Sequence, residues 1–551
     1  MTILCTMEKP GWCVDLYYFL CSMISKYLDG VWTPFVPSLV QSYMDGDTSI
    51  RDFVQWDPTL ASIQSYADAR VFSPEKRTIL ADVLTRQYAG IQWSQSKVLE
   101  NIASLADAKT FTITTWQQVH AFLWPVFFVT KILDCIATAE QATQESNDKK
   151  FVPIFWMASE DHDFAEVSHV SVYGESFDWT MDGIGGAVGK LSPAWLDVMV
   201  QALRARLDDT EIHTKYLDMF AYAYNHFSTL AQATHYILDQ LFGDKWLVVI
   251  DGDDTDLKSL FAPIMHADIF ADVSTPAIVS QTDKLVTLWY KKQAHPREIN
   301  IFFMTDSHRW RIIKDEDTYS IDWTDQVFSQ NDLESQLEQH PESFSPNVFL
   351  RPLYQETILP NVLYVPGPAE FNYWLQMKEL FAVHGLVMPV VIPRTFNQFI
   401  GSKNYEKISE GPIDVETYFL PYDDFLETVR SLDTHTLSDV ENLISGLEND
   451  VTQIQQKFAD KRITHKKITK SLANIQQELS TLHHVVDAAA TATIEESENY
   501  APYIKMKQKF FSDEDRFERN NFVVGQLSVV DQLLQKDIIG SCLGKVLLYV
   551  Y

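Results

Sequence analysis

The stretch Phe151-Val-Pro-Ile-Phe-Trp-Met-Ala-Ser-Glu-Asp-His-Asp-Phe164 joins an apolar run to an acidic cluster. The run from Phe151 to Met157 is almost wholly apolar, which is typical of a strand buried on both faces of a parallel sheet. Ser159 is a favourable helix N-cap, and the carboxylates after it would lie in a first helical turn, at the positive end of the helix dipole. This order places the polar side chains at the carboxyl edge of the sheet, where open α/β folds bind ligands.

Composition limits the classes of protein to which the chain can belong. With 551 residues and 46% hydrophobic content, the chain can bury a large core and is expected to form two or three domains. A net charge of -31 argues against nucleic acid and against an anionic membrane surface as partners. The five cysteines are scattered and form no C-x-x-C pair, which favours a reducing, cytoplasmic location. No stretch reads as a signal peptide or a membrane span.

Further strands and helices extend the sheet on both sides of the quoted stretch. Buried strands are predicted at residues 111–115, 246–251, 361–365 and 388–392. Helices are predicted at residues 125–137 and 369–383, and a β-hairpin at 299–304 and 309–313. Parallel strands that alternate with helices predict an α/β fold with a doubly wound, Rossmann-like domain over residues 110–395. Residues 165–245 and 256–340 are then insertions into this core.

The remaining segments flank this core. Residues 1–109 are expected to form a helical segment packed on the core, and residues 396–436 a linker. Within residues 437–511 apolar side chains recur every four and three residues, which predicts an α-helical coiled coil. A polar break predicts a turn near residues 459–464, although one continuous helix with a polar dent is the alternative. The exposed apolar seam predicts self-association, and residues 512–551 are expected to dock on the core.

The acidic cluster after Met157 is the first candidate for chemistry. His162 is flanked by carboxylates, which favour the imidazolium and can orient the ring for work as a general base. The spacing matches no zinc signature, so no metal is predicted here. The alternative interpretation is structural, with Glu160, Asp161 and Asp163 at the start of a helix and His162 bonded to a nearby backbone group.

The second candidate cluster lies between Ser345 and Glu370. Polar residues stand here in an otherwise apolar setting: Arg351, Tyr354, Gln355, Glu356, Asn361 and Glu370. Buried polar groups must be paired, so these residues form either a ligand site or an internal network. Arg351 is the candidate for binding a carboxylate or phosphate, because its planar guanidinium can bind either group through two hydrogen bonds. The alternative is a structural ion pair of Arg351 with Glu356 or with Glu370.

Three weaker signals each allow two interpretations. The glycine-rich run at residues 183–189 is read as a loop, with phosphate binding as the alternative. The aspartates at 251, 253 and 254 could hold magnesium or could cap a helix in a solvated loop. The basic residues at 308, 309 and 311 suit an anionic ligand or a hairpin with surface ion pairs.

Three long motifs resemble the BshC family, the cysteine-adding enzymes of bacillithiol biosynthesis: residues 155–164, residues 344–361, and Gly367-Pro-Ala-Glu370 with Tyr373-Trp374. The similarity covers nearly the whole chain. The resemblance implies a Rossmann-like core with connecting-peptide insertions and a homodimer formed by the coiled coil. It also implies a ligase that joins cysteine to glucosaminyl-malate by an amide bond, with ATP or another nucleotide activating the cysteine carboxylate.

The resemblance also assigns roles to residues of this chain. The catalytic candidates are His162, Asp163, Glu160 and Asp161, of which His162 or Asp163 takes a proton from the attacking amine. The substrate-binding candidates are Gln117, Gln118, Lys131, Arg351, Tyr354, Gln355, Asn361 and Glu370. Gln117, Gln118 and Arg351 are expected to position the carboxylates of malate or cysteine.

The chain departs from the family pattern in two loops. Trp116 and Trp124 stand where the family has glycines, and an indole there crowds space that a glycine leaves open. Pro366-Gly367 replaces a double glycine and removes one backbone donor. These departures motivate a rival function, a non-catalytic binding or scaffold protein with a degenerate site. A metal-assisted hydrolase built on the acidic strand ends is a third class.

Overall fold

The computed structural model describes most of the chain. The described residues are 24–27, 36–91, 95–123, 125–172, 175–180, 185–305, 308–432, 438–460, 465–511, 527–535 and 543–550. The chain forms two compact units. The first unit is built mainly from Val36–Gln398 and Glu518–Tyr549, and the second mainly from Phe399–Phe517.

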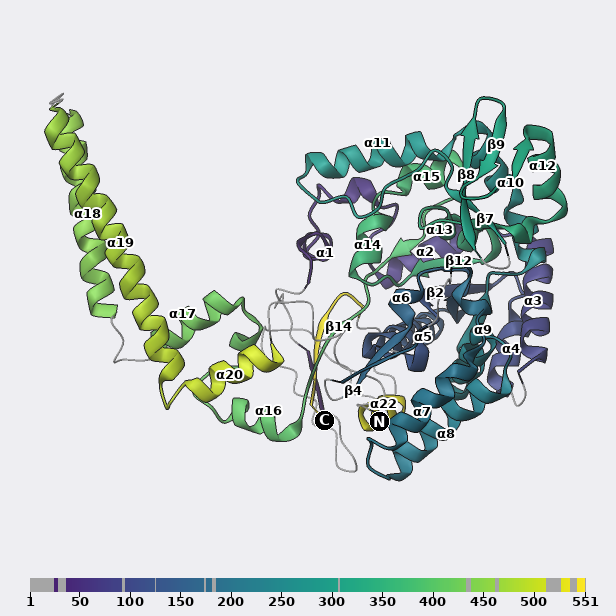
Figure 1. The fold of residues 1–551 in the computed structure, drawn as a ribbon, viewed down its shortest axis with the longest axis horizontal. Helices are drawn as coiled ribbons and strands as arrows, with labels where there is room; N and C mark the ends of the chain where they lie inside the picture. The colour runs from purple at the N-terminus through teal and green to yellow at the C-terminus, as the bar shows by residue number, and fades with distance from the viewer. Residues whose placement is uncertain are drawn as a thin grey trace. The chain divides into compact units, whose positions relative to one another are not determined.

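A five-stranded parallel sheet forms the centre of the first unit, in the order β13-β12-β2-β3-β6. Its neighbouring strands β12 and β2 are labelled in Figure 1. Its strands are β2 (Thr110–Gln118), β3 (Lys150–Ala158), β6 (Val248–Asp251), β12 (Asn361–Tyr364) and β13 (Val390–Val391). Each strand overlaps one that the sequence predicts, so the predicted parallel α/β core is confirmed. The long register between β2 and β3 pairs Trp116 with Trp156 and Gln118 with Ala158, which brings both carboxyl ends to one level.

The order of the strands contains one point at which the chain reverses direction across the sheet. From β2 the chain runs outward through β3 to β6, and it later returns to the other side of β2 as β12 and β13. The carboxyl ends of β2 and β12 therefore flank a topological switch point, the usual ligand crevice of open α/β sheets. The connection from β2 to β3 contains α5 (Val126–Glu145), which confirms the predicted helix.

The predicted helix at residues 369–383 is divided into α14 (Pro368–Trp374) and α15 (Lys378–Val383). Neither proline nor glycine marks this break in the sequence. Instead, the buried Gln376 side chain donates hydrogen bonds to the Thr282 hydroxyl at 2.7 Å and to the Ala294 carbonyl at 3.2 Å. The break thus depends on tertiary contacts that local sequence does not encode.

Helices and a second sheet surround the parallel sheet in the first unit. Before β2 the structure contains α1 (Ser38–Met44), α2 (Leu60–Ala69), α3 (Pro74–Ala89) and α4 (Ser96–Ser104), as expected for a helical N-terminal segment. Before residue 36 the structure describes only β1 (Ile24–Tyr27). Between β3 and β6 lie α6 (Phe164–Val167), β4 (His169–Val172), β5 (Glu175–Asp178), α7 (Leu196–Arg204), α8 (Glu211–His226) and α9 (Leu230–Phe242).

The segment after β6 begins with α10 (Thr255–Ala271) and α11 (Ser274–Thr287). It then forms an antiparallel sheet in the order β10-β9-β8-β7-β11. Its strands are β7 (Ile301–Met304), β8 (Arg309–Asp315), β9 (Thr318–Ile321), β10 (Val327–Ser329) and β11 (Phe344–Pro346), with α12 (Gln330–Gln339) before β11. The pairing of β7 with β8 confirms the predicted hairpin. The helix α13 (Leu350–Ile358) then leads into β12.

The last part of the described chain adds helices and a small sheet. The second unit contains α16 (Ser402–Ser409), α17 (Tyr422–Leu432), α18 (Ser438–Asp460), α19 (Lys466–Glu496) and α20 (Ala501–Phe510). The closing stretch contains α22 (Leu527–Gln535) and β15 (Val546–Val550). A three-stranded sheet has the order β1-β15-β14, where β14 spans Phe396–Ile400. Across the described helices, no segment is long and apolar enough to cross a membrane.

The helices α18 and α19 run antiparallel, as contacts between distant residues show. Gln455 donates a hydrogen bond to Gln476 at 2.9 Å, and Glu448 lies 3.5 Å from His483. A shorter helix therefore returns against a longer one, as the polar break in the sequence predicts, and the continuous-helix alternative is wrong. The predicted turn itself falls on residues 461–464, which lie outside the described part of the chain.

Candidate functional site

A cavity of about 290 Å³ opens at the carboxyl edge of the parallel sheet, within the first unit. Three aromatic side chains form part of its wall: Trp116 at the end of β2, Trp156 in β3, and Phe302 in β7. The sequence suggests that the Trp116 indole would crowd this space, but the indole lies along the cavity wall and leaves the cavity in place. Trp124, the other tryptophan of this loop, lies outside the described residues.

The turn after β3 is not the helix start that the sequence predicts. Backbone N–H groups of Val188 and Gly189 donate hydrogen bonds to the carbonyls of Asp161 and Ser159, at 2.7 and 2.9 Å. A side chain at Gly189 would place its Cβ 2.6 Å from the Ser159 carbonyl, so glycine permits this approach. The helix α6 begins only at Phe164, and its N-cap is Asp163 rather than Ser159. The glycine-rich loop therefore supports the site by holding this turn.

His162 and Asp161 lie beside the cavity and face Arg309 of β8. The Asp161 carboxylate accepts a hydrogen bond from Gln118 at 2.7 Å and lies 3.7 Å from the Arg309 guanidinium. Burial alone would raise the pKa of Asp161, but its bonds with His162 and Gln118 and the Arg309 charge hold that pKa well below its usual value. The half-exposed imidazole has its Nδ1 3.5 Å from Asp161 and 3.4 Å from Arg309. The tautomer decides which of these contacts forms a hydrogen bond.

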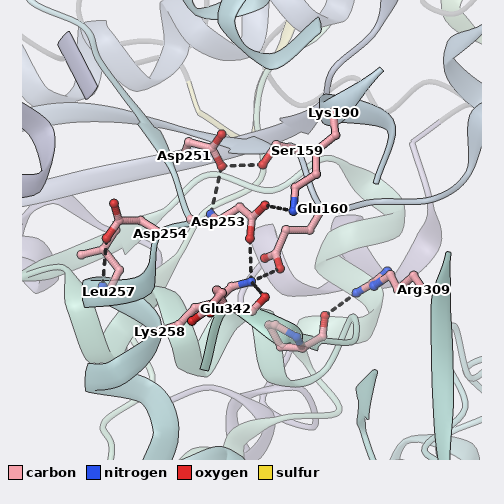
Figure 2. Close-up of polar contacts among 12 residues, drawn as sticks. Ser159, Glu160, Lys190, Asp251, Asp253, Asp254, Leu257, Lys258, Arg309 and Glu342 are labelled. Carbon is pink, nitrogen blue, oxygen red and sulfur yellow. Dashed lines mark hydrogen bonds and ion pairs between the residues drawn. The ribbon is translucent and has the colours of Figure 1, made fainter. Parts of the chain in front are cut away.

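Glu160 points into a buried ionic cluster (Figure 2). The Lys258 ammonium of α10, whose side chain is only 1% exposed, lies 2.6 Å from Glu160 and 2.7 Å from Asp253. It also donates a hydrogen bond to the Glu342 carbonyl at 3.1 Å. Burial would lower the pKa of Lys258, but the two carboxylates raise it above its ordinary value. Lys258 therefore remains charged and ties the ends of β3 and β6 together.

The aspartates after β6 all have protein partners. Asp251 accepts a hydrogen bond from the Ser159 hydroxyl, and burial raises the pKa of Asp251 to about 6 (Figure 2). Asp253 contacts Lys190 at 2.9 Å in addition to Lys258. Asp254 caps α10 through the backbone N–H groups of Asp256 and Leu257, which fits the helix-capping alternative. Among the described residues, no group of three histidine, cysteine or acidic side chains is arranged to hold a metal ion.

Arg351 lines the cavity from the first turn of α13. The Asn347 side chain accepts hydrogen bonds from the N–H groups of Phe349 and Leu350, which fixes the start of this helix. The Arg351 guanidinium lies 4.8 Å from the centre of the Trp116 ring, a cation–π arrangement, and donates a hydrogen bond to Gln355 at 3.1 Å. Its Nε and Nη2 atoms are buried without a hydrogen-bond partner among the described residues. Such donors are costly to bury, so they favour an anionic ligand.

The two ion pairs that the sequence suggests for Arg351 do not form. Glu370 pairs with Lys131 at 2.6 Å and accepts a hydrogen bond from the Tyr364 hydroxyl. Lys131 is buried, and this burial, against the nearby Glu370 charge, lowers its pKa to about 8. Glu356 pairs with Arg70 at 3.4 Å. Neither carboxylate therefore pairs with Arg351, and its hydrogen bond to Gln355 is to a neutral side chain.

Several substrate-binding candidates lie in the interior rather than on the cavity wall. Glu356 accepts hydrogen bonds from Asn361 at 2.6 Å and from Gln355 at 3.0 Å, and with Arg70 these residues form what we call the interior network. Tyr354 donates a hydrogen bond to the Gly252 carbonyl at 2.7 Å. Lys131 and Glu370 also do not line the cavity. Gln117 contacts His120 at 3.3 Å, whereas Gln118 reaches the site through Asp161.

Part of the cavity wall was not predicted from the sequence. Arg297 and His295 line the cavity from the segment before β7, and Arg309 enters it from the predicted hairpin. Arg309 donates a hydrogen bond to the Pro346 carbonyl at 2.7 Å and lies over the Phe302 ring. The basic spot around residues 308–311 was the only signal for this wall, because Arg297 has no local motif. Lys258, the centre of the ionic cluster, was missed entirely.

Comparisons with known proteins agree with this architecture. A family model described as Bacillithiol biosynthesis BshC, N-terminal Rossmann-like domain, matches residues 26–395. A Cytophaga hutchinsonii protein named "Putative cysteine ligase BshC" is 36% identical over 393 residues, which cover 71% of this chain and 72% of that protein. Proteins of the same name from Flavobacterium johnsoniae and Flavobacterium psychrophilum are 33% and 29% identical over 406 and 514 residues. These matches cover 73% and 91% of this chain, and 75% and 94% of those proteins.

Proposed function

Because the chain belongs to the BshC family of bacillithiol biosynthesis, we propose that it is a ligase that joins cysteine to glucosaminyl-malate by an amide bond. The observation that carries this proposal is the cavity beside the switch point of the parallel sheet. Its wall holds two buried N–H groups of Arg351 that have no hydrogen-bond partner among the described residues and that suit a carboxylate. The Asp161–His162 pair lies beside it. Relatives that match most of the chain carry the name of a cysteine ligase.

In the proposed reaction, His162 takes a proton from the attacking amine. Asp161 orients the imidazole, and Gln118 and Arg309 keep Asp161 ionised. Asp163 is the weaker candidate for this role, because it is exposed and its carboxylate caps α6 at 3.2 Å from the Glu166 nitrogen. Arg351 binds a substrate carboxylate, and Gln117 and Gln118 lie at the strand end where they can extend this contact.

Activation by ATP or another nucleotide is part of the proposal, because a carboxylate is a poor acceptor for an amine. The nucleotide supplies a leaving group on the cysteine carboxyl carbon, and that group departs as the carbon–nitrogen bond forms. Arg297 and Arg309 line the cavity and supply the positive charge that an anionic phosphate group requires, whereas Lys131 is already paired with Glu370. The scattered cysteines support a cytoplasmic location for this chemistry.

The direct test is to incubate the purified protein with cysteine, glucosaminyl-malate and ATP, and to detect the condensed thiol by mass. We expect product to depend on all three substrates. Substitution His162→Ala should abolish product without unfolding the protein, whereas Asp163→Ala should retain it. Product formation at the wild-type rate in His162→Ala would overturn the assignment of the base.

The rival function is a non-catalytic scaffold with a degenerate site, for which Trp116 is the motivating residue. Titration of the protein with ATP and with glucosaminyl-malate separates the two functions. The ligase proposal requires saturable binding of both molecules. If neither molecule binds and no product forms, the scaffold interpretation replaces the ligase.

We include a homodimer through a coiled coil of α18 and α19 in the proposal. Within this hairpin Ile444 and Val451 are buried, but Leu443, Leu447 and Ile475 are 70%, 52% and 48% exposed. Exposed leucine and isoleucine at seam positions favour association with a second copy. Light scattering should report a dimer, and Leu447→Lys with Ile475→Lys should convert it to a monomer. A wild-type monomer at micromolar concentration would contradict this part.

A further inference from the structure

The cavity is lined by charged groups of both signs, which we call its acidic wall and its basic wall. Glu160 and Asp161 extend from the end of β3, whereas Arg297, Arg309 and Arg351 line the cavity from the segment before β7, from β8 and from α13. A ligand with a single kind of charge would use only one of these walls. A cavity of about 290 Å³ is at the small end of the range for ligand sites, which suits a molecule the size of an amino acid.

Glu160 is the acidic group that the fold positions most firmly. Its Oε1 atom lies 2.6 Å from Lys258, and Lys258 is fixed in turn by Asp253 and by the Glu342 carbonyl (Figure 2). A carboxylate can accept about four hydrogen bonds, and among the described residues Lys258 is the only partner of Glu160. The carboxylate therefore retains acceptor capacity while it lines the cavity.

Arg351 of the basic wall provides the complementary charge in the same cavity. Arg351 is only 8% exposed, and its Nε and Nη2 donors have no hydrogen-bond partner among the described residues. These donors and the Glu160 carboxylate belong to one cavity, so a ligand that carries both an ammonium and a carboxylate can satisfy both walls. The aromatic rings of Trp116 and Trp156 line the same cavity and offer a face on which a thiol side chain can rest.

We propose that the cavity binds the amino-acid substrate as a zwitterion, with its α-ammonium group on Glu160 and its carboxylate on Arg351. Lys258 is a positioning residue, because it fixes Glu160 without touching the substrate. This inference rests on the proposed function, since it identifies how cysteine is recognised. It also changes the role of Glu160 from a catalytic group to a specificity-determining group that keeps the α-amino group protonated and unavailable for attack.

The test measures binding of three ligands to the full chain by calorimetry: L-cysteine, 3-mercaptopropionate, which lacks the amino group, and cysteamine, which lacks the carboxylate. Wild-type protein should bind cysteine about tenfold or more tightly than either analogue, the scale of one hydrogen bond to a charged group. Glu160→Gln should weaken cysteine binding to the level of 3-mercaptopropionate while leaving the affinity for 3-mercaptopropionate unchanged. Arg351→Met should remove the preference for cysteine over cysteamine.

Lys258→Met tests the positioning role, because a general structural defect would weaken all three ligands together. We expect Lys258→Met to weaken cysteine and cysteamine but not 3-mercaptopropionate. Lys190→Met is the matched control, because Lys190 contacts Asp253 from an exposed position and should leave all affinities unchanged. Equal weakening of cysteine and 3-mercaptopropionate by Glu160→Gln would overturn the inference.

The condensation assay separates this inference from the function on which it rests. If wild-type protein makes the condensed thiol but Glu160→Gln retains the full preference for cysteine, the function stands and the inference fails. If another amino acid binds with the predicted dependence on Glu160 and Arg351 but no cysteine product forms, the inference stands and the function fails. Absence of amino-acid binding at millimolar concentration would overturn the inference directly.

Discussion

The interior network and the cavity wall are two polar clusters that share the helix α13, but they differ in what they leave open. In the interior network Glu356 is paired with Arg70 and bonded to Asn361 and Gln355. One turn earlier, Arg351 also bonds to Gln355 but keeps two buried donors unpartnered among the described residues. The first arrangement pairs opposite charges inside the protein, although Arg70 Nε and Glu356 Oε2 also lack a hydrogen bond among the described residues. The second leaves a polar group whose natural partner is a ligand.

Residue type therefore does not distinguish structural from functional polar groups in this chain. Arg351 and Glu356 lie in the same motif, residues 344–361, and both are buried. The role of each group depends on whether its charged and hydrogen-bonding atoms already have protein partners. Those partners, such as Arg70 and Lys131, are distant in the sequence.

The largest expected effects come from substituting one residue in each cluster, Arg351 in the cavity wall and Glu356 in the interior network. Arg351→Met should reduce condensation by about 100-fold, because a misplaced substrate carboxylate costs this much, with little loss of stability. Glu356→Ala should instead destabilise the fold by about 3 to 5 kcal/mol, because it leaves Arg70 buried without its carboxylate. Product formation per folded molecule and urea denaturation measure the two effects. A variant at Glu356 that stays stable but inactive would break the distinction.

The second effect concerns the pH dependence of stability. Burial raises the pKa of Glu356 to about 7, although Arg70, Asn361 and Gln355 oppose the shift. The folded state therefore holds this proton more tightly than the unfolded state, and Glu356 makes stability fall as pH rises from about 4.5 to 7.

Glu356→Gln keeps the acceptor for Asn361 but removes the titration. It should stabilise the protein at pH 8 by about 2 to 3 kcal/mol relative to its effect at pH 4.5. Denaturant unfolding at the two pH values measures this difference. An equal effect of the substitution at both pH values would contradict the perturbed pKa.

The third effect tests whether Gly189 of the glycine-rich loop supports the cavity by holding the turn after β3. Gly189→Ala should destabilise the protein by about 1 to 3 kcal/mol, because the new methyl group would meet the Ser159 backbone and side chain. It should also slow condensation, since the displaced turn carries Glu160 and Asp161. Gly446→Ala in α18 is the matched control, because its Cβ would meet no atom within 4 Å. Unchanged activity and stability of Gly189→Ala would contradict the described contact.

The smallest expected effect separates two neighbouring residues. Asp163→Ala should cost about 1 kcal/mol, the usual contribution of a helix N-cap, and should leave condensation near the wild-type rate. His162→Ala should have the opposite profile. Thermal unfolding and initial rates measured on both variants test this contrast, and a large loss of rate in Asp163→Ala would assign the base to that carboxylate.

Continuous apolar runs between polar loops predicted the parallel strands of the core, because strands buried on both faces have this pattern. The same pattern predicted a site at the carboxyl edge, where Arg351 and Asp161 line the cavity and His162 lies beside Asp161. The turn after β3 was predicted wrongly because its helix start is replaced by hydrogen bonds from Val188 and Gly189. No local propensity encodes a contact with a segment that arrives from an insertion.

The ion-pair partners of charged residues were the second feature that the sequence did not predict. Arg351 was expected to pair with Glu356 or Glu370 because these residues are close in the chain. Tertiary structure instead supplies Arg70 and Lys131 as their partners. Lys258 was missed for the same reason, since its meaning depends on Glu160 and Asp253 at the ends of two different strands.

Cysteine is proposed to bind in the cavity at the carboxyl edge of the parallel sheet. A crystal structure of the protein soaked with L-cysteine tests this claim most directly. We predict density for cysteine between Trp116 and Trp156, with its carboxylate within hydrogen-bond distance of Arg351 and its ammonium against Glu160. Cysteine bound elsewhere on the chain, with this cavity filled only by water, would contradict the account.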